Sequence, residues 1–269
     1  GTSAIGLYLE DPRDGRDLFE ALQDTGKPVV ALIGGRSDQG RQAAASHTGG
    51  MVSDTRVWSA LARQTGIALV TSQDDLISVL DFFDLHARRA GPDTADVLVI
   101  GPSGGASVLA ADVFDAAGLT LGGLPDAART ALRELGLGAG TSLANPLEVP
   151  VGPRTDPDLV RRAVTAIVGH RPYADVLAHV NVQSFFTYGT SAEPLLGYAR
   201  GVAALQEERG DLRVTLVTRN AECAPAGVED DVRAIARAAG VPVYRSMEAA
   251  AACVAAARNM RERSGHGQA

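Results

Sequence analysis

Short apolar runs alternate along the chain with longer amphipathic, alanine-rich segments. The runs have the length and the β-branched content of buried strands, whereas the longer segments carry apolar residues at helical spacing. The predicted strands are 4–10, 28–34, 67–70, 97–101, 175–182, 213–218 and 241–245. The predicted helices are 16–25, 54–65, 74–89, 106–118, 158–169, 191–208, 229–239 and 246–261. Residues 34–50 and 136–157 are predicted to be loops.

Strands that alternate with helices predict parallel sheets that are covered on both faces. We therefore predict an α/β protein with two doubly wound domains, at residues 1–90 and 96–262, joined by a polar linker at 91–95 and followed by a tail at 263–269. The first domain has only about three predicted strands. Because such a sheet is thin, we expect this domain to be N-terminally incomplete or to lean on the second.

The composition excludes several classes of protein. The net charge is −7 and no basic block is present, which argues against nucleic acid as a partner. No apolar run has the length of a membrane span, and the two cysteines lack metal-type spacing, so we expect a cytoplasmic protein. The single lysine, Lys27, leaves no GxxxxGK[ST] nucleotide loop. No metal site is predicted, since the sequence has no HExxH and the other histidines show no ligand spacing.

The stretch RQAAASHTGGMVSD places His47 among small and hydroxyl residues just after a predicted strand. Ligands of open α/β sheets bind beyond the carboxyl ends of the strands, and Glu10 ends a neighbouring strand at the same edge. A histidine can act there as nucleophile or base, with the carboxylate fixing its tautomer. The alternative is an ordinary surface histidine.

Two further segments are candidates for binding an anion. GPSGG, at 101–105, joins a strand to a helix, and its unobstructed N–H groups and the helix dipole suit a phosphate. Such turns are also common in α/β folds without a ligand. Asn145, in SLANPLEV, either lines a phosphate site or belongs to a simple X-Pro turn.

These segments together resemble a known family. GRSDQGRQAAASHTGG is similar to the phosphohistidine loop of the nucleoside-diphosphate-forming acyl-CoA synthetases, which include the ADP-forming acetate–CoA ligases and, more distantly, succinyl-CoA synthetase. YLEDPRDGRDLFEAL, VIGPSGGASVLAADVFDAAGL and SLANPLEV resemble other parts of the same proteins. The resemblance covers about residues 3–260 and implies two succinyl-CoA-ligase-like, flavodoxin-like domains.

The resemblance implies a ligase that converts an acid, CoA and ATP into an acyl-CoA, ADP and phosphate. His47 matches the histidine that carries the phosphoryl group, and Glu10 matches the glutamate that supports it. The residues expected to bind the phosphate are Ser46, Thr48, Gly49, Ser103, Gly104, Gly105 and Asn145.

The same resemblance implies partners. CoA, ATP or ADP, and Mg²⁺ would be bound mostly by a CoA-binding Rossmann domain and an ATP-grasp domain, neither of which the sequence contains. A small carboxylic acid would be the substrate, and we expect an oligomer. The sequence departs from the family at Ala106, where proline is frequent, and at Glu148, where aspartate is usual.

We therefore expect this chain to be an incomplete portion of such a ligase that is inactive alone. One alternative is a catalytically silent module that senses acyl-CoA or nucleotide, as in regulatory regions of protein acetyltransferases. Another is an unrelated flavodoxin-like binding domain. The presence of both His47 and Glu10 favours the enzyme.

Overall fold

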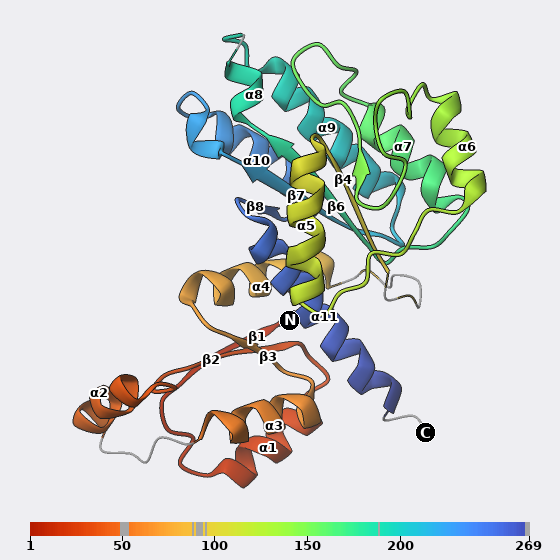
Figure 1. Cartoon of the computed structure of the whole chain (residues 1–269). Coiled ribbons are helices and arrows are strands. Elements are labelled where there is room, and N and C mark those ends of the chain that lie inside the picture. Colours follow the sequence, from red (N-terminus) through yellow and green to blue (C-terminus); the bar gives the residue numbers. More distant parts are fainter. Residues whose placement is uncertain (49–53, 88, 90–93, 95, 188, 267–269) are drawn as a thin grey trace. The chain divides into compact units, whose positions relative to one another are not determined.

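The computed structural model describes residues 1–48, 54–87, 89, 94, 96–187 and 189–266, without the side chains of 44, 45, 47, 48 and 261–266. The chain groups into two compact units, one of Gly1–Ala87 with Ala252–Ala269 and one of Arg88–Ala251 (Figure 1). The second predicted domain extends to residue 262, whereas residues 252–262 group with the first unit. The domain boundaries stay a prediction.

The first unit contains a parallel sheet in the order β1-β2-β3, formed by β1 (Ile5–Leu9), β2 (Val29–Ile33) and β3 (Ala68–Val70). Leu9 lies opposite Ile33, so β1 and β2 end at the same edge. Three strands were predicted here, and three are found among the described residues. Every residue of β2 is buried, as expected for the central strand of a covered sheet.

Helices cover both faces of this sheet. The helices of the unit are α1 (Gly15–Asp24), α2 (Asp38–Thr48), α3 (Thr55–Thr65) and α4 (Gln73–His86). Helices α1 and α3 contact each other and bury Leu22 and Trp58 against Ala31 and Ile33 of β2. Helix α4 contacts all three strands and places Leu80 against Gly6, where a Cβ would lie 2.7 Å from a Leu80 methyl carbon. Asp14, Asp54 and Ser72 cap α1, α3 and α4 with side-chain oxygens.

Helix α2 contradicts the prediction of a loop over residues 34–50. Ser37 accepts a hydrogen bond from the Gly40 N–H at 3.0 Å, which satisfies one of the first N–H groups of the helix. Asp38 stands in the first turn, where a carboxylate interacts favourably with the helix dipole. The run Ala43–Ala45 then supplies the residue with the highest helix propensity. The prediction gave more weight to the glycines and serines than to these helix-forming signals.

The second unit contains a five-stranded parallel sheet in the order β5-β4-β6-β7-β8. Its strands are β4 (Val97–Gly101), β5 (Leu147–Glu148), β6 (Asp175–Asn181), β7 (Arg213–Arg219) and β8 (Val243–Tyr244). Numbered within the unit, this order is 2-1-3-4-5, which is that of flavodoxin. The predicted α/β class with doubly wound, flavodoxin-like sheets is confirmed.

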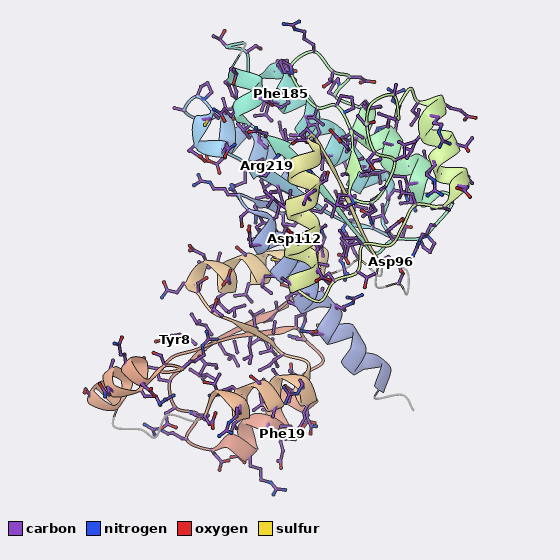
Figure 2. The ribbon with its side chains drawn as sticks, in the orientation of Figure 1. Tyr8, Phe19, Asp96, Asp112, Phe185 and Arg219 are labelled. Atoms are coloured by element: carbon purple, nitrogen blue, oxygen red, sulfur yellow. The ribbon has the colours of Figure 1, made fainter. Side chains whose placement is uncertain are left out.

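The helices of the second unit also occupy two faces. They are α5 (Gly104–Ala116), α6 (Asp126–Glu134), α7 (Leu159–Val168), α8 (Gln183–Phe186), α9 (Glu193–Glu208) and α10 (Val228–Ala238), with a 3₁₀ turn at Ala221–Cys223 and the start of α11 (Met247–His266). Helix α7 contacts α6 and α9, α9 also contacts α10, and their side chains share a core with Leu98, Val176 and Phe185 (Figure 2). Helix α5 contacts β4 and β5, and Figure 1 shows it in front of the strands.

A buried ion pair joins the first residues of β6 and β7. Arg213 donates to both carboxylate oxygens of Asp175, at 2.7 and 2.6 Å, and both side chains are only 8% exposed. Two parallel charge-assisted hydrogen bonds fit the geometry of a guanidinium and a carboxylate. The pair holds the register in which Asp175 lies opposite Arg213.

We expect Asp175→Ala to lower the free energy of unfolding by about 3–5 kcal/mol, because it leaves the Arg213 charge buried without this partner. The double variant Asp175→Leu/Arg213→Leu should lose less, since it removes both charges. Urea unfolding of the full chain measures both effects. A wild-type midpoint in Asp175→Ala would contradict a structural role for the pair.

Candidate functional site

The carboxyl edge of the first sheet brings Glu10 and Tyr8 together over Gly34. The Tyr8 hydroxyl donates a hydrogen bond to Oε1 of Glu10 at 3.0 Å (Figure 2 labels Tyr8). A Cβ on Gly34 would lie 3.1 Å from Glu10 Cγ and 3.3 Å from the Tyr8 oxygen, so glycine leaves room for both side chains. The hydrogen bond to Glu10 and its negative charge raise the pKa of Tyr8. Glu10 is half-buried and held in place at the edge where β2 leads into α2.

His47 lies near the end of α2, and its side chain is outside the described residues, as is that of Thr48. Gly49 lies outside the described residues altogether. The Ser46 hydroxyl donates to the carbonyl of Gln42 at 3.0 Å, within its own helix. The nine residue steps from Asp38 to His47 correspond to about 14 Å along a helix axis. His47 is therefore carried at the far end of a helix whose first turn follows the sheet edge.

The three residues Ser103, Gly104 and Gly105 form the turn between β4 and α5. Ser103 has φ 81° and ψ 118°, a conformation that costs a non-glycine residue strain and is typical of functional turns. Its carbonyl accepts from the Ser107 N–H at 3.1 Å and so begins the helix. Ser103 and Gly104 are exposed, as the phosphate-binding prediction requires.

A carboxylate stands beside this turn. A Cβ on Gly104 would lie 3.3 Å from Oε2 of Glu148, the last residue of β5. The start of a helix favours negative charge, so Glu148 is stabilised there. An incoming phosphate would have to share this helix end with the Glu148 carboxylate.

Asn145 lies elsewhere and has other hydrogen-bond partners. Its amide nitrogen donates to the carbonyls of Val97, at 2.7 Å, and Gly122, at 3.0 Å, while its oxygen accepts from the Val99 N–H at 3.0 Å. The side chain thus extends the edge of β4 where the two-residue strand β5 does not reach. This arrangement supports the structural alternative, and the phosphate role of Asn145 stays a prediction.

A pair of polar residues that was not predicted from the sequence lies on the α5 side of the second sheet. His179 on β6 is fully buried, and neither of its ring nitrogens has a hydrogen-bond partner among the described residues. Its ring lies against Gly101, where a Cβ would come 2.5 Å from Nε2. Arg219, at the carboxyl end of β7, is half-buried, and its Nε is also without a described partner.

Burial, with a smaller contribution from the Arg219 charge, lowers the pKa of His179 to about 3. The ring is therefore neutral at physiological pH. Burial also lowers the pKa of Arg219. Val217 pairs with His179, so Arg219, two residues farther along β7, faces the same side of the sheet. This depends on the register between the strands, and no signal in the sequence alone identified Arg219.

Residues 1–83 match the family model described as the succinyl-CoA ligase like flavodoxin domain. The acetate–CoA ligase [ADP-forming] II subunit alpha of Pyrococcus furiosus is 29% identical over 251 residues, which are 93% of this chain and 51% of that protein. The acetate–CoA ligase [ADP-forming] II of Archaeoglobus fulgidus is 33% identical over 120 residues, 45% of this chain and 17% of that protein. This chain is a relative of the ADP-forming acyl-CoA synthetases. It spans about half the length of the Pyrococcus subunit.

The fold of the present chain is also that of a solved acyl-CoA synthetase. The dinucleotide forming acetyl-coenzyme A synthetase 1 of Ca. Korarchaeum cryptofilum, in complex with phosphate and ADP, has a TM-score of 0.78 and 20% identity. The match covers 98% of this chain and 55% of that one. None of the helices searched, all within the described part of the chain, is both long and apolar enough to cross a membrane.

We expect Asn145→Ala to lower the free energy of unfolding by about 2–3 kcal/mol, because it leaves three backbone groups of the second unit without their partner. Chemical unfolding measures the loss, and Asn145→Asp should lose at least as much, because its second carboxylate oxygen would face the carbonyl oxygens of Val97 and Gly122. Stability equal to that of the wild type would argue instead for a ligand-binding role.

We expect the stability of the chain to fall as the pH drops below about 6.5, because His179 becomes protonated in the unfolded chain but stays neutral in the folded one. The contribution of a neutral His179 is fully present above that pH and is lost as the pH falls toward 3. His179→Leu removes this dependence, so its loss between pH 7 and pH 4.5 should be smaller by about 2 kcal/mol. Urea unfolding at both pH values measures it, and equal losses in both proteins would contradict the assignment.

Proposed function

We propose that the chain is the phosphoryl-relay part of an ADP-forming acyl-CoA synthetase, with His47 as the residue that carries the phosphoryl group. The observation that carries this proposal is the conjunction of the similarity to those enzymes with a glutamate at the sheet edge and a histidine on the helix that begins beside it. Glu10 ends β1, and α2, which bears His47, follows the adjacent strand β2.

The proposed chemistry needs a ring nitrogen with a free electron pair and a second nitrogen that holds a proton. A ring nitrogen of His47 attacks the terminal phosphorus of ATP, the bond to the ADP oxygen breaks, and an N–P bond forms. The carboxylate of the acid then attacks that phosphorus, which gives an acyl phosphate and regenerates the ring. The thiol of CoA displaces phosphate from the acyl carbon. Glu10 would accept a hydrogen bond from the other ring nitrogen and so stabilise the charge on the phosphorylated ring.

Helix α2 suits a carrier. Gly35, with φ 70°, lies between β2 and the helix, and a Cβ on Gly40 would lie 3.2 Å from its Cα. Figure 1 shows α2 apart from α1 and α3, as suits a helix that would carry a group from one site to another. The α5 start, with exposed N–H groups at Ser103 and Gly104, would stabilise the added negative charge.

The remaining partners of the proposed enzyme are an ATP-grasp domain for ATP and Mg²⁺, a CoA-binding Rossmann domain and a small carboxylic acid. The chain would then act only within a larger assembly, in the reducing interior of the cell. One observation favours the alternative of a silent sensing module. The Glu148 carboxylate beside Gly104 already occupies part of the helix end that the phosphate would use.

The test combines the chain with an ATP-grasp domain that has been shown to bind ATP, adds [γ-³²P]ATP and Mg²⁺, and measures acid-labile, base-stable phosphate on the chain. We expect label on the wild type and none on His47→Ala. Glu10→Gln should slow labelling by roughly 10–100-fold, because it removes the negative charge that stabilises the phosphorylated ring.

The control is His170→Ala, which removes an exposed histidine just after helix α7. This variant should keep full labelling. Absence of label on the wild type would refute the relay and support the sensing module. Label that persists in His47→Ala would place the phosphoryl group on another residue.

A further inference from the structure

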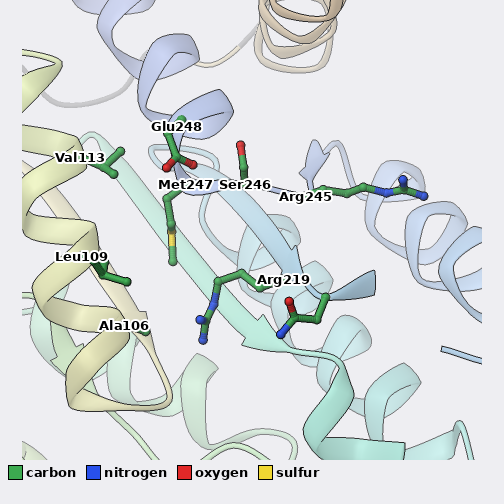
Figure 3. A pocket seen from close by; sticks show the side chains of 9 residues that line it. Ala106, Leu109, Val113, Arg219, Arg245, Ser246, Met247 and Glu248 are labelled. Carbon is green, nitrogen blue, oxygen red and sulfur yellow. The ribbon is translucent and has the colours of Figure 1, made fainter. Parts of the chain in front are cut away.

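A pocket of about 270 Å³ lies wholly within the second unit, on the α5 side of its sheet. Its walls come from α5, the carboxyl end of β7 and the first residues of α11 (Figure 3). One wall is apolar and includes Leu109, Val113 and Met247. Arg219 and Glu248 contribute charged side chains to the lining of the pocket. The volume is at the lower limit of small-molecule sites, so the ligand must be small.

Arg219 gives the pocket an unsatisfied positive charge. Its Nε is buried and has no hydrogen-bond partner among the described residues. A buried guanidinium N–H without a partner is costly, and a carboxylate or phosphate can accept from two of its N–H groups at once. Arg245 also borders the pocket, but it donates to both oxygens of Glu229, at 2.8 and 2.5 Å. The neutral ring of His179 adds no charge, so Arg219 is the anion-binding group.

The apolar wall selects against a purely inorganic anion. The Leu109 side chain is 65% exposed, although it is a large hydrophobic residue at the mouth of a pocket. A ligand with a hydrocarbon body would cover Leu109 together with Val113 and Met247, and each Å² of apolar surface removed from water stabilises the complex by about 25 cal/mol. Inorganic phosphate has no hydrocarbon body and would leave this apolar surface exposed to water.

The charged groups of Arg219 and Glu248 lie at different ends of the pocket. In Figure 3 the Arg219 guanidinium points toward Ala106 in the first turn of α5, whereas Glu248 lies beside Val113, farther along the helix. A ligand with its carboxylate on Arg219 would extend its body along α5 toward Glu248. A second carboxylate at the far end of that body would be repelled by Glu248.

We propose that this pocket binds a small monocarboxylic acid with an apolar body, its carboxylate held by Arg219. That this acid is the acyl substrate rests on the proposed function, whereas the binding itself does not. The placement fits that role, because Ala106 adjoins Gly105 and the bound carboxylate would lie beside the first turn of α5, where the phosphate is proposed to bind.

The experiment titrates the full chain with hexanoate and follows binding by isothermal titration calorimetry. The same titration is made with adipate, which adds a second carboxylate to the same six carbons, with hexan-1-ol, which lacks a carboxylate, and with inorganic phosphate. We expect hexanoate to bind at least tenfold more tightly than the other three.

The variants locate the site. Arg219→Gln should weaken hexanoate binding by about 10–100-fold, the range for a hydrogen bond to a charged group. Arg200→Gln removes an exposed arginine of the same unit, which pairs with Glu193, and should leave the affinity unchanged. Glu248→Gln should improve adipate binding and leave hexanoate binding nearly unchanged. Unfolding midpoints verify that each variant is folded.

A second measurement places the ligand directly. The chain has three methionines, and only Met247 is among the residues that line this pocket. With ¹³C-methyl methionine, hexanoate should shift the Met247 signal, assigned with Met247→Leu, and leave the Met260 signal in place.

No binding of hexanoate to the wild type, or binding that Arg219→Gln leaves intact, would overturn the inference. Phosphate binding as tight as that of hexanoate would also overturn it, because it would show an anion site without selectivity for an acid. The labelling of His47 is a separate readout. If His47 is not labelled but hexanoate binds, only the proposed relay is refuted. If His47 is labelled but hexanoate does not bind, only the proposed pocket is refuted.

Discussion

Burial on both faces is the constraint on which this structure depends. Strands such as β2 and β4 have every residue buried, so they offer no polar side chain to solvent along their length. Parallel strands all end at the same edge, and polar groups gather there because this is where the chain leaves the core. Glu10 follows β1, Ser103 follows β4, and Arg219 ends β7. The residues proposed to hold the anions lie at these edges for the same reason.

The elements of the fold could be predicted because each carries its own local signal. The short, β-branched-rich runs at 97–101 and 213–218 predicted buried strands, and β4 and β7 lie there. The order β5-β4-β6-β7-β8 could not be predicted, since β5 is two residues long and is defined by its pairing with Ile100 and Gly101. Helix α2 was missed for a different reason: its glycine and serine residues suggested a loop, while its capping serine and alanine run favoured a helix.

The candidate site likewise contains residues that could be predicted from the sequence and residues that could not. Glu10 and the turn at Ser103 each stand directly after a strand, and His47 lies in the segment that follows β2, so position in the sequence was enough to select them. Asn145 could not be interpreted from its neighbours, because the groups it binds on Val97 and Val99 are 48 and 46 residues away. His179 and Arg219 were not predicted because each matters only together with the other, through the face of the sheet on which both side chains lie. That face is fixed by the register between β6 and β7 and not by either strand alone.

The charges around α5 suggest how one helix could serve two anions. Glu148 stands beside Gly104, so the helix end already has a carboxylate near it, and an additional phosphate would meet repulsion. Arg219 directs its guanidinium toward Ala106 in the first turn of the same helix, and no described acidic side chain pairs with its Nε. A carboxylate bound on Arg219 would neutralise this charge, whereas a phosphate would benefit from it only while the pocket is empty. In the proposed mechanism the acid attacks the phosphoryl group that His47 carries, and the acyl phosphate so formed would carry its phosphoryl oxygens to the helix start and its apolar body along α5.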